Sequence, residues 1–203
     1  GKSMKRQSMN SMPFSLTTLI GLLRTWSRTL GLARWWSQWE PETSGKSLMS
    51  IFKGLESIVE ENVPVGRFTW FKLGGPARYF IQPENEEQLA EVTRRCRENS
   101  IPVLVMGGGA NLLIPDEGID GAVVRLAGDF KKVDITEEGV VTAGGGADMS
   151  KLNLRCVREG LAGMECLTGI PGSVGGGVRM NAGGAFGDIG NIVHRVQLMD
   201  ATG

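Results

Sequence analysis

The chain has 203 residues, enough for one large or two small domains. Its 22 basic and 22 acidic residues cancel overall, but residues 1–48 carry a net charge of +5 and the remainder carries −5. A nucleic-acid-binding protein would present a basic face on its folded part, so this distribution argues against that class.

Residues 1–48 form a basic leader, which we predict to be disordered or a single helix. Between positions 13 and 39, apolar residues recur at helical spacing, with Arg24 and Arg28 on another face. One interpretation is an amphipathic helix on a membrane surface. The other, which we favour, is a disordered leader or sequence upstream of the natural start, because Met49 begins an ordinary enzyme N-terminus. No apolar run reaches the roughly 18 residues of a membrane helix.

The next part of the chain, residues 49–128, is predicted to be a compact α/β unit. Apolar spacing favours a short helix over 50–62, and a Gly-Gly-Pro turn precedes a strand at 77–82. Residues 85–99 read as a helix, with acidic residues in its first turn and basic residues in its last. Two apolar runs, at 101–106 and 121–126, read as strands, the first of them buried. The buried stripe of the helix is expected at Leu89, Val92 and Cys96.

Residues 129–203 are predicted to form a second, α+β unit. A hairpin of two strands is expected over 131–146, with an acidic, glycine-containing turn. A helix follows, capped by Asp148 and ended by Gly160, with Met149, Leu152 and Cys156 facing inward. After a long glycine-rich loop, an alternating strand from residue 191 runs into a final Ala-Thr-Gly turn.

The three cysteines and the one histidine give little sign of catalytic or metal chemistry. Cys96, Cys156 and Cys166 are an odd number without a Cys-x-x-Cys pair, which favours a reducing compartment and packing roles and predicts no metal site. His194 lies in the alternating segment, where we expect a structural histidine.

Three glycine-rich loops stand out: Gly107–Asn111, Ala143–Asp148 and Gly169–Gly177. Loops without side chains, next to helix N-termini, expose backbone N–H groups to an anion, and phosphate or pyrophosphate is the natural ligand. The alternative is that all three are only tight turns. Neither the P-loop nor the Rossmann glycine spacing is present, so a dinucleotide would be held by a different fold.

Four stretches carry a family resemblance: "FKLGGPARYF", "VLVMGGGANLLI", "GLAGMECLTGIPGSVGGGVRMNAGGAFGDIG" and "VQLMDATG". In this order and spacing they resemble the FAD-binding part of the UDP-N-acetylenolpyruvoylglucosamine reductases, also called UDP-N-acetylmuramate dehydrogenases. The resemblance covers about residues 62–203. It implies an α+β fold: a PCMH-type FAD-binding domain of the vanillyl-alcohol-oxidase superfamily, built from two α+β subdomains that clasp the cofactor.

The resemblance also implies cofactor-binding residues. The first loop would wrap the FAD pyrophosphate, and the second would run along the cofactor and continue past the end of the "GIPGSVGGG" stretch. The implied residues are Gly107, Gly108, Gly109, Ala110, Asn111, Leu112 and Leu113 in the first loop, Thr168, Gly169, Pro171, Gly172, Ser173, Gly175 and Gly176 in the second, and Asn181, Ala182 and Gly183 in its continuation.

The implied reaction is a two-step reduction with noncovalent FAD. NADPH would pass a hydride to the flavin, which would reduce the enolpyruvyl double bond of UDP-N-acetylglucosamine enolpyruvate. The proton-donating Ser of the family, with its Glu and Arg partners, lies in motifs beyond this chain, so we assign no catalytic residue. We expect a cytoplasmic monomer without nucleic-acid or membrane contact. The alternatives are another flavin oxidase or dehydrogenase of the superfamily, or a non-catalytic flavin-binding module.

Overall fold

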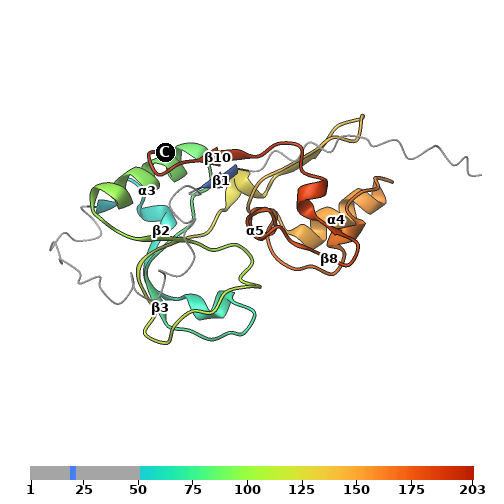
Figure 1. Ribbon diagram of the computed structural model, residues 1–203. Coiled ribbons are helices and arrows are strands. Elements are labelled where there is room, and N and C mark those ends of the chain that lie inside the picture. Colours follow the sequence, from blue (N-terminus) through green and yellow to red (C-terminus); the bar gives the residue numbers. More distant parts are fainter. Residues whose placement is uncertain (1–18, 22–50) are drawn as a thin grey trace, which may run out of the picture.

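The computed structural model describes residues 19–21 and 51–203 (Figure 1). Apart from the short strand β1 (Leu19–Gly21), the predicted leader lies outside the described residues. Within the described ranges, no helix is both long and apolar enough to cross a membrane.

The first unit, residues 51–131, is built on a four-stranded sheet. Its strands are β2 (Val59–Pro64), β3 (Pro76–Ile81), β4 (Val103–Val105) and β5 (Ile119–Val124), in the spatial order β2-β3-β5-β4. β3, β5 and β4 are parallel, whereas β2 is antiparallel to β3. Helix α3 (Glu86–Glu98) connects β3 to β4. The parallel strands therefore end at one common edge, and the loops that follow them gather there.

Helix α3 forms where the sequence predicted it, because its signals are local. The side chain of Asn85 accepts a hydrogen bond from the Gln88 amide and caps the first turn. Leu89, Val92 and Cys96 are all buried against the sheet, which confirms the predicted stripe.

The predicted helix over 50–62 is wrong. The segment instead forms a short 3₁₀ turn, η1 (Glu56–Ile58), and then strand β2. Val59 and Val63 are the buried positions of β2, and a spacing of four residues satisfies a helix and a strand equally well. Asn62 adopts a left-handed conformation, with φ of 53°, which a helix interior does not accommodate.

The strand predicted at 101–106 exists, but it is an edge strand and only partly buried. β4 has a neighbour on one side alone, and Val105 is 37% exposed. Its side chains line a cavity, described below, and Val103 and Leu104 also pack against the core.

The second unit, residues 132–193, consists of a hairpin, helices and short turns. The hairpin pairs β6 (Val133–Ile135) with β7 (Val141–Ala143), as predicted. Helix α4 (Met149–Arg158) follows its predicted cap, since the Asp148 carboxylate accepts from the Lys151 amide at 2.8 Å. The remaining elements are η3 (Gly128–Lys131) at the junction, η4 (Glu165–Leu167), α5 (Val174–Met180), β8 (Gly183–Gly184), β9 (Gly187–Asp188) and η5 (Ile189–Asn191).

Two further predictions in this unit need correction. The glycine-rich stretch that was predicted as a loop through Gly177 is helical from Val174, because Ser173 caps α5. The alternating strand from residue 191 is confined to β10 (Gln197–Met199), which pairs with β1, and His194 lies outside it and is exposed.

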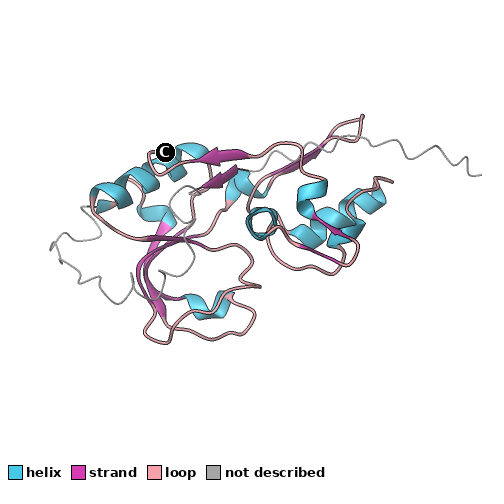
Figure 2. Cartoon of the chain, viewed as in Figure 1, coloured by secondary structure: helices cyan, strands magenta, loops and turns pink. Residues whose placement is uncertain are grey.

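Three apolar clusters hold the fold together. Two of them cover the opposite faces of the first sheet: α3 packs on the face that carries Tyr79 and Ile81, and Phe80 and Val123 belong to the cluster on the other. The third lies within the second unit, around Met149, Leu152 and Cys156. Figure 2 shows the magenta sheet beside the predominantly helical second unit. The domain boundary between residues 128 and 129 stays a prediction.

Candidate functional site

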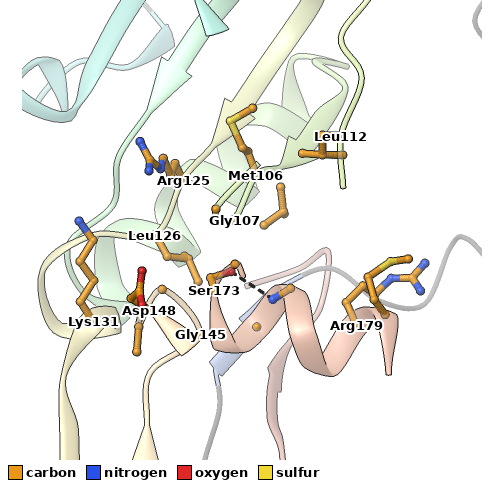
Figure 3. A pocket seen from close by; sticks show the side chains of 18 of the residues that line it. Met106, Gly107, Leu112, Arg125, Leu126, Lys131, Gly145, Asp148, Ser173 and Arg179 are labelled. Atoms are coloured by element: carbon orange, nitrogen blue, oxygen red, sulfur yellow. Dashed lines mark hydrogen bonds between the residues drawn. The ribbon is translucent and has the colours of Figure 1, made fainter. Parts of the chain in front are cut away.

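A cavity of about 1570 Å³ lies between the two units. Its walls come from β4 and the loop after it, the end of β5, the loop before α4 and the start of α5 (Figure 3). β4 and β5 run parallel, so Met106 and Arg125, which directly follow them, lie at the same edge of the sheet. Crevices at the carboxyl ends of parallel strands are common ligand sites in α/β proteins.

Two of the predicted glycine loops contact each other at this cavity. A Cβ built on Gly107 would overlap the hydroxyl of Ser173, and one built on Gly108 would lie 2.8 Å from the Cα of Gly172. Side chains are excluded at both positions, which explains the glycines there. The two loops, more than sixty residues apart in sequence, therefore share one site.

The third glycine loop lies directly against the second. The carbonyl of Gly145 accepts from the Gly175 amide, and that of Ala147 accepts from the Val174 amide, both at 2.8 Å. In return, the carbonyl of Gly172 accepts from the Met149 amide at 3.0 Å. These bonds hold the N-termini of α4 and α5 side by side. Gly145, Gly146 and Ala147 line the cavity, although the implied set of cofactor-binding residues did not include them.

Some backbone N–H groups of these loops have a hydrogen-bond acceptor within the protein, and others do not. At the start of α5, the amides of Val174 and Gly175 bond to the neighbouring loop, and that of Gly176 bonds to the Ser173 hydroxyl at 3.2 Å. The amides of Gly107–Ala110, by contrast, have no acceptor within the described part of the chain. A row of free backbone N–H groups at a glycine turn is a typical anion site. Of these four residues, Gly107 and Gly108 line the cavity, so the first loop has backbone N–H groups that are available to an anion there.

The charged residues around the cavity are nearly all basic. Asp148 is the only acidic group among the described lining residues, and its Oδ1 is engaged as the cap of α4. The lining cations are Arg97, Arg125, Lys131, Lys151, Arg155 and Arg179. Such a positive lining favours an anionic ligand.

Apolar side chains form the rest of the walls. They offer weakly polar surfaces, which suit aromatic ring systems. They include Trp70, Ile101, Val103, Leu104, Val105, Met106, Leu112, Leu126, Val133, Leu152 and Met180.

The predicted site residues fall into two groups. Those that line the cavity are Gly107, Gly108, Leu112, Pro171, Gly172, Ser173, Gly175 and Gly176. Those outside its lining are Gly109, Ala110, Asn111, Leu113, Thr168, Gly169, Asn181, Ala182 and Gly183.

Several residues of the second group have other contacts. Gly109, with φ of 69°, lies against the backbone of Phe68, and its carbonyl accepts from the Trp70 amide. Thr168 accepts a hydrogen bond from the Asn153 side chain at 3.2 Å. Asn181 ends α5 in a left-handed conformation, and its side chain accepts from the Gly190 amide.

Comparison with known proteins shows to which family the chain belongs. A family model described as "FAD binding domain" matches residues 77–203, more than half of the chain. The chain belongs to this family. The mixed α+β architecture is therefore that of an FAD-binding domain.

The FAD-binding domain is similar to curated UDP-N-acetylenolpyruvoylglucosamine reductases. It is 46% identical over 140 residues to the enzyme of Heliobacterium modesticaldum, which covers 69% of this chain and 44% of that protein. It is 40% identical over 157 residues to the enzyme of Clostridioides difficile, covering 77% of this chain and 51% of that protein. The chain thus spans about half the length of these relatives.

A solved structure gives the same result. The crystal structure of UDP-N-acetylenolpyruvylglucosamine reductase (MurB) from Thermus caldophilus matches with a TM-score of 0.55 and 39% identity. The match covers 64% of this chain and 44% of that one. The chain is therefore a homologue of the FAD-binding region of these reductases.

Proposed function

We propose that this chain is the FAD-binding part of the reductase that converts UDP-N-acetylglucosamine enolpyruvate to UDP-N-acetylmuramate in peptidoglycan precursor synthesis. The observation that supports this most directly is the contact of Gly107 and Gly108 with Gly172 and Ser173 at one cavity. We further propose the PCMH-type division into two α+β subdomains, residues 49–128 and 129–203, with FAD between them.

The residues around the cavity suit FAD in charge, polarity and size. The free amides of Gly107–Ala110 and the surrounding cations match a diphosphate. The apolar walls match the adenine and flavin rings. The cavity volume of about 1570 Å³ exceeds the roughly 300–1,000 Å³ of a pocket for a drug-sized ligand, as a dinucleotide requires.

The roles of this chain are to bind and orient the cofactor. The amides of Gly107 and Gly108, which line the cavity, would hold the diphosphate, and the Gly172–Ser173 segment would form the opposing wall. When bound, FAD supplies the redox chemistry of the reduction. We assign no proton donor to this chain. The described lining contains neither His nor Cys, the residues most often used for a covalent flavin link, which supports noncovalent binding.

The remaining features of the proposal rest on the similarity to the reductases. They are NADPH as the hydride donor, the UDP-sugar as the substrate, a monomeric state and a cytoplasmic location. The three cysteines are free thiols, which agrees with a reducing compartment.

The absorption spectrum of the purified chain tests the proposal. We expect the bands of an oxidised flavin, released into solution on denaturation, and saturable FAD binding by the apoprotein. A colourless protein that does not bind added FAD would contradict it. Because the relatives are about twice as long, we expect no turnover of the UDP-sugar by this chain alone.

A further inference from the structure

We propose that Arg125 is the side chain that binds the cofactor diphosphate, an inference that rests on the proposed FAD function. The glycine loops contribute backbone donors but no charge of their own. The positive charge must therefore come from a neighbouring element, and Arg125 lies at the edge of the sheet where the first loop begins.

The position of Arg125 is set by the sheet. It directly follows β5, and its amide donates to the carbonyl of Ile81 at 2.9 Å. On the other side, the Met106 amide donates to the carbonyl of Val124 at 2.9 Å, which places Met106 beside Arg125 on the neighbouring strand. Gly107, the first residue of the glycine loop, directly follows Met106 and is therefore one residue along the chain from the neighbour of Arg125.

The orientation of the guanidinium group is set by an aromatic pair. Its Cζ lies 4.9 Å from the centroid of the Phe68 ring, a cation–π contact. The Phe68 ring in turn stacks on Phe80, with centroids 4.9 Å apart and an angle of 11° between the planes. Phe80 is buried in the core, so the stack rests on a rigid support.

Arg125 differs from the other five lining cations in its exposure. It is half-buried, whereas Arg97, Lys131, Lys151, Arg155 and Arg179 are exposed. No carboxylate within the described ranges forms an ion pair with it. In Figure 3, Arg125 and Arg179 lie on opposite sides of Gly107. A half-buried charge is less screened by water and salt than an exposed one, so Arg125 is the cation best suited to hold an anion.

A guanidinium group matches this ligand in geometry as well as charge. Its planar fork can donate two parallel hydrogen bonds to phosphate oxygens, whereas an ammonium group acts as a point charge. The free amides of Gly107–Ala110 can bond the remaining oxygens. Arg125 therefore selects ligands that carry a diphosphate, and it has no part in binding the flavin ring.

The test compares three ligands on two variants of the whole 203-residue chain. FAD carries a flavin, a diphosphate and an adenosine, ADP carries the adenosine and a diphosphate without the flavin, and riboflavin carries the flavin without a diphosphate. For Arg125→Met we expect the affinities for FAD and ADP to fall by about 10- to 100-fold, the range for losing a charged hydrogen-bond partner. The affinity for riboflavin should stay the same, and Arg125→Lys should retain part of the FAD affinity.

Arg78→Met is the matched control. Arg78 also lies over an aromatic ring, at 5.2 Å from the Tyr79 centroid, but it pairs with Asp120 and does not line the cavity. Its replacement should leave all three affinities unchanged. If Arg125→Met does not fold, the conservative variant Arg125→Lys serves as the test instead. Wild-type affinity for FAD in Arg125→Lys would overturn a bidentate role of the guanidinium group.

The outcomes separate this inference from the proposed function. Unchanged FAD affinity in Arg125→Met, or an equal loss of riboflavin binding, overturns the role of Arg125 while leaving FAD binding by the chain intact. A wild-type chain that binds neither FAD nor ADP overturns the proposed function itself.

Discussion

Gly108 lies directly against Gly172, so that a Cβ on Gly108 would stand 2.8 Å from the Cα of Gly172 and 3.3 Å from the Ser173 amide nitrogen. This contact joins the first unit to the second beside the cavity. The position of each loop therefore depends on the absence of a side chain in the other.

A valine at position 108 should separate the loops. Because the neighbouring atoms belong to the backbone, they cannot rotate away, and Gly108→Val should weaken FAD binding at least 100-fold, about 2.7 kcal/mol or more. Titration of the apoprotein with FAD measures this. Gly184→Ala is the control, because nothing lies within 4 Å of a Cβ at that position. Unchanged affinity in Gly108→Val would show that this loop is not at the cofactor.

Ser173 should contribute to stability through its cap. Its hydroxyl accepts from the Gly176 amide at 3.2 Å, so Ser173→Ala should lower the free energy of unfolding by about 1 kcal/mol. Urea denaturation of the apoprotein provides the measurement. Ser150→Ala, at an exposed position of α4, should change it by less than about 0.5 kcal/mol. Equal effects in the two variants would count against the cap.

The buried thiol of Cys96 should make the fold sensitive to alkaline pH. Burial raises the pKa of Cys96 to about 12, whereas the unfolded thiol ionises near 8.5. Above pH 8.5 the unfolded state loses a proton that the folded state keeps, so stability falls as the pH rises toward 12.

Only one proton is involved, and this limits how steeply the stability can fall with pH. The slope is at most about 1.4 kcal/mol per pH unit, so wild type should lose about 2 kcal/mol more than Cys96→Ala between pH 8.5 and 10.5. Urea denaturation at the two pH values measures the difference. Parallel losses in both proteins would contradict the burial of this thiol.

Glu91 should stabilise α3 at neutral pH but not in acid. Hydrogen bonds from Arg94 and Arg95 lower the pKa of Glu91 to about 2. Its stabilising effect is therefore present above the unfolded pKa of about 4.3 and lost as the pH falls toward 2.

The glutamate is partly exposed, with 32% of its side chain accessible, so screening limits the effect to about 0.5–1 kcal/mol. Thermal melts of Glu91→Gln should show this deficit at pH 7 and a smaller one at pH 3. Glu60→Gln, at an exposed position of β2, should change little at either pH. A deficit that does not depend on pH would point to packing instead of charge.

The sequence was sufficient for elements whose signals lie within a few residues. The helices at Glu86–Glu98 and Met149–Arg158 were found from their caps and their apolar spacing. It was insufficient for β2, where the Val59–Val63 spacing fits a helix and a strand equally well, and for β4, whose apolar residues pack on the core and also line a cavity. Pairing with β3 and the position at the edge of the sheet decided these cases.

In the candidate site, too, some features were predictable from the sequence and others were not. The glycine loops were recognisable because glycine clusters require a physical reason, and the family motifs gave that reason. Arg125 was not predicted, although a cation directly after a strand was a usable signal. The sequence does not show that this strand lies next to the one that precedes Gly107.

The sequence by itself therefore determined the family, the glycine loops and the local helices, since each depends on residue types at short spacing. Only the tertiary structure decided that Gly107 and Gly108 meet Gly172 and Ser173, and that Arg125 lies beside Met106, the residue before the first loop, at the same cavity. The physical reason is that a binding site is a set of distances between segments remote in the chain. Those distances are fixed by strand order and by packing between the units, not by any one segment.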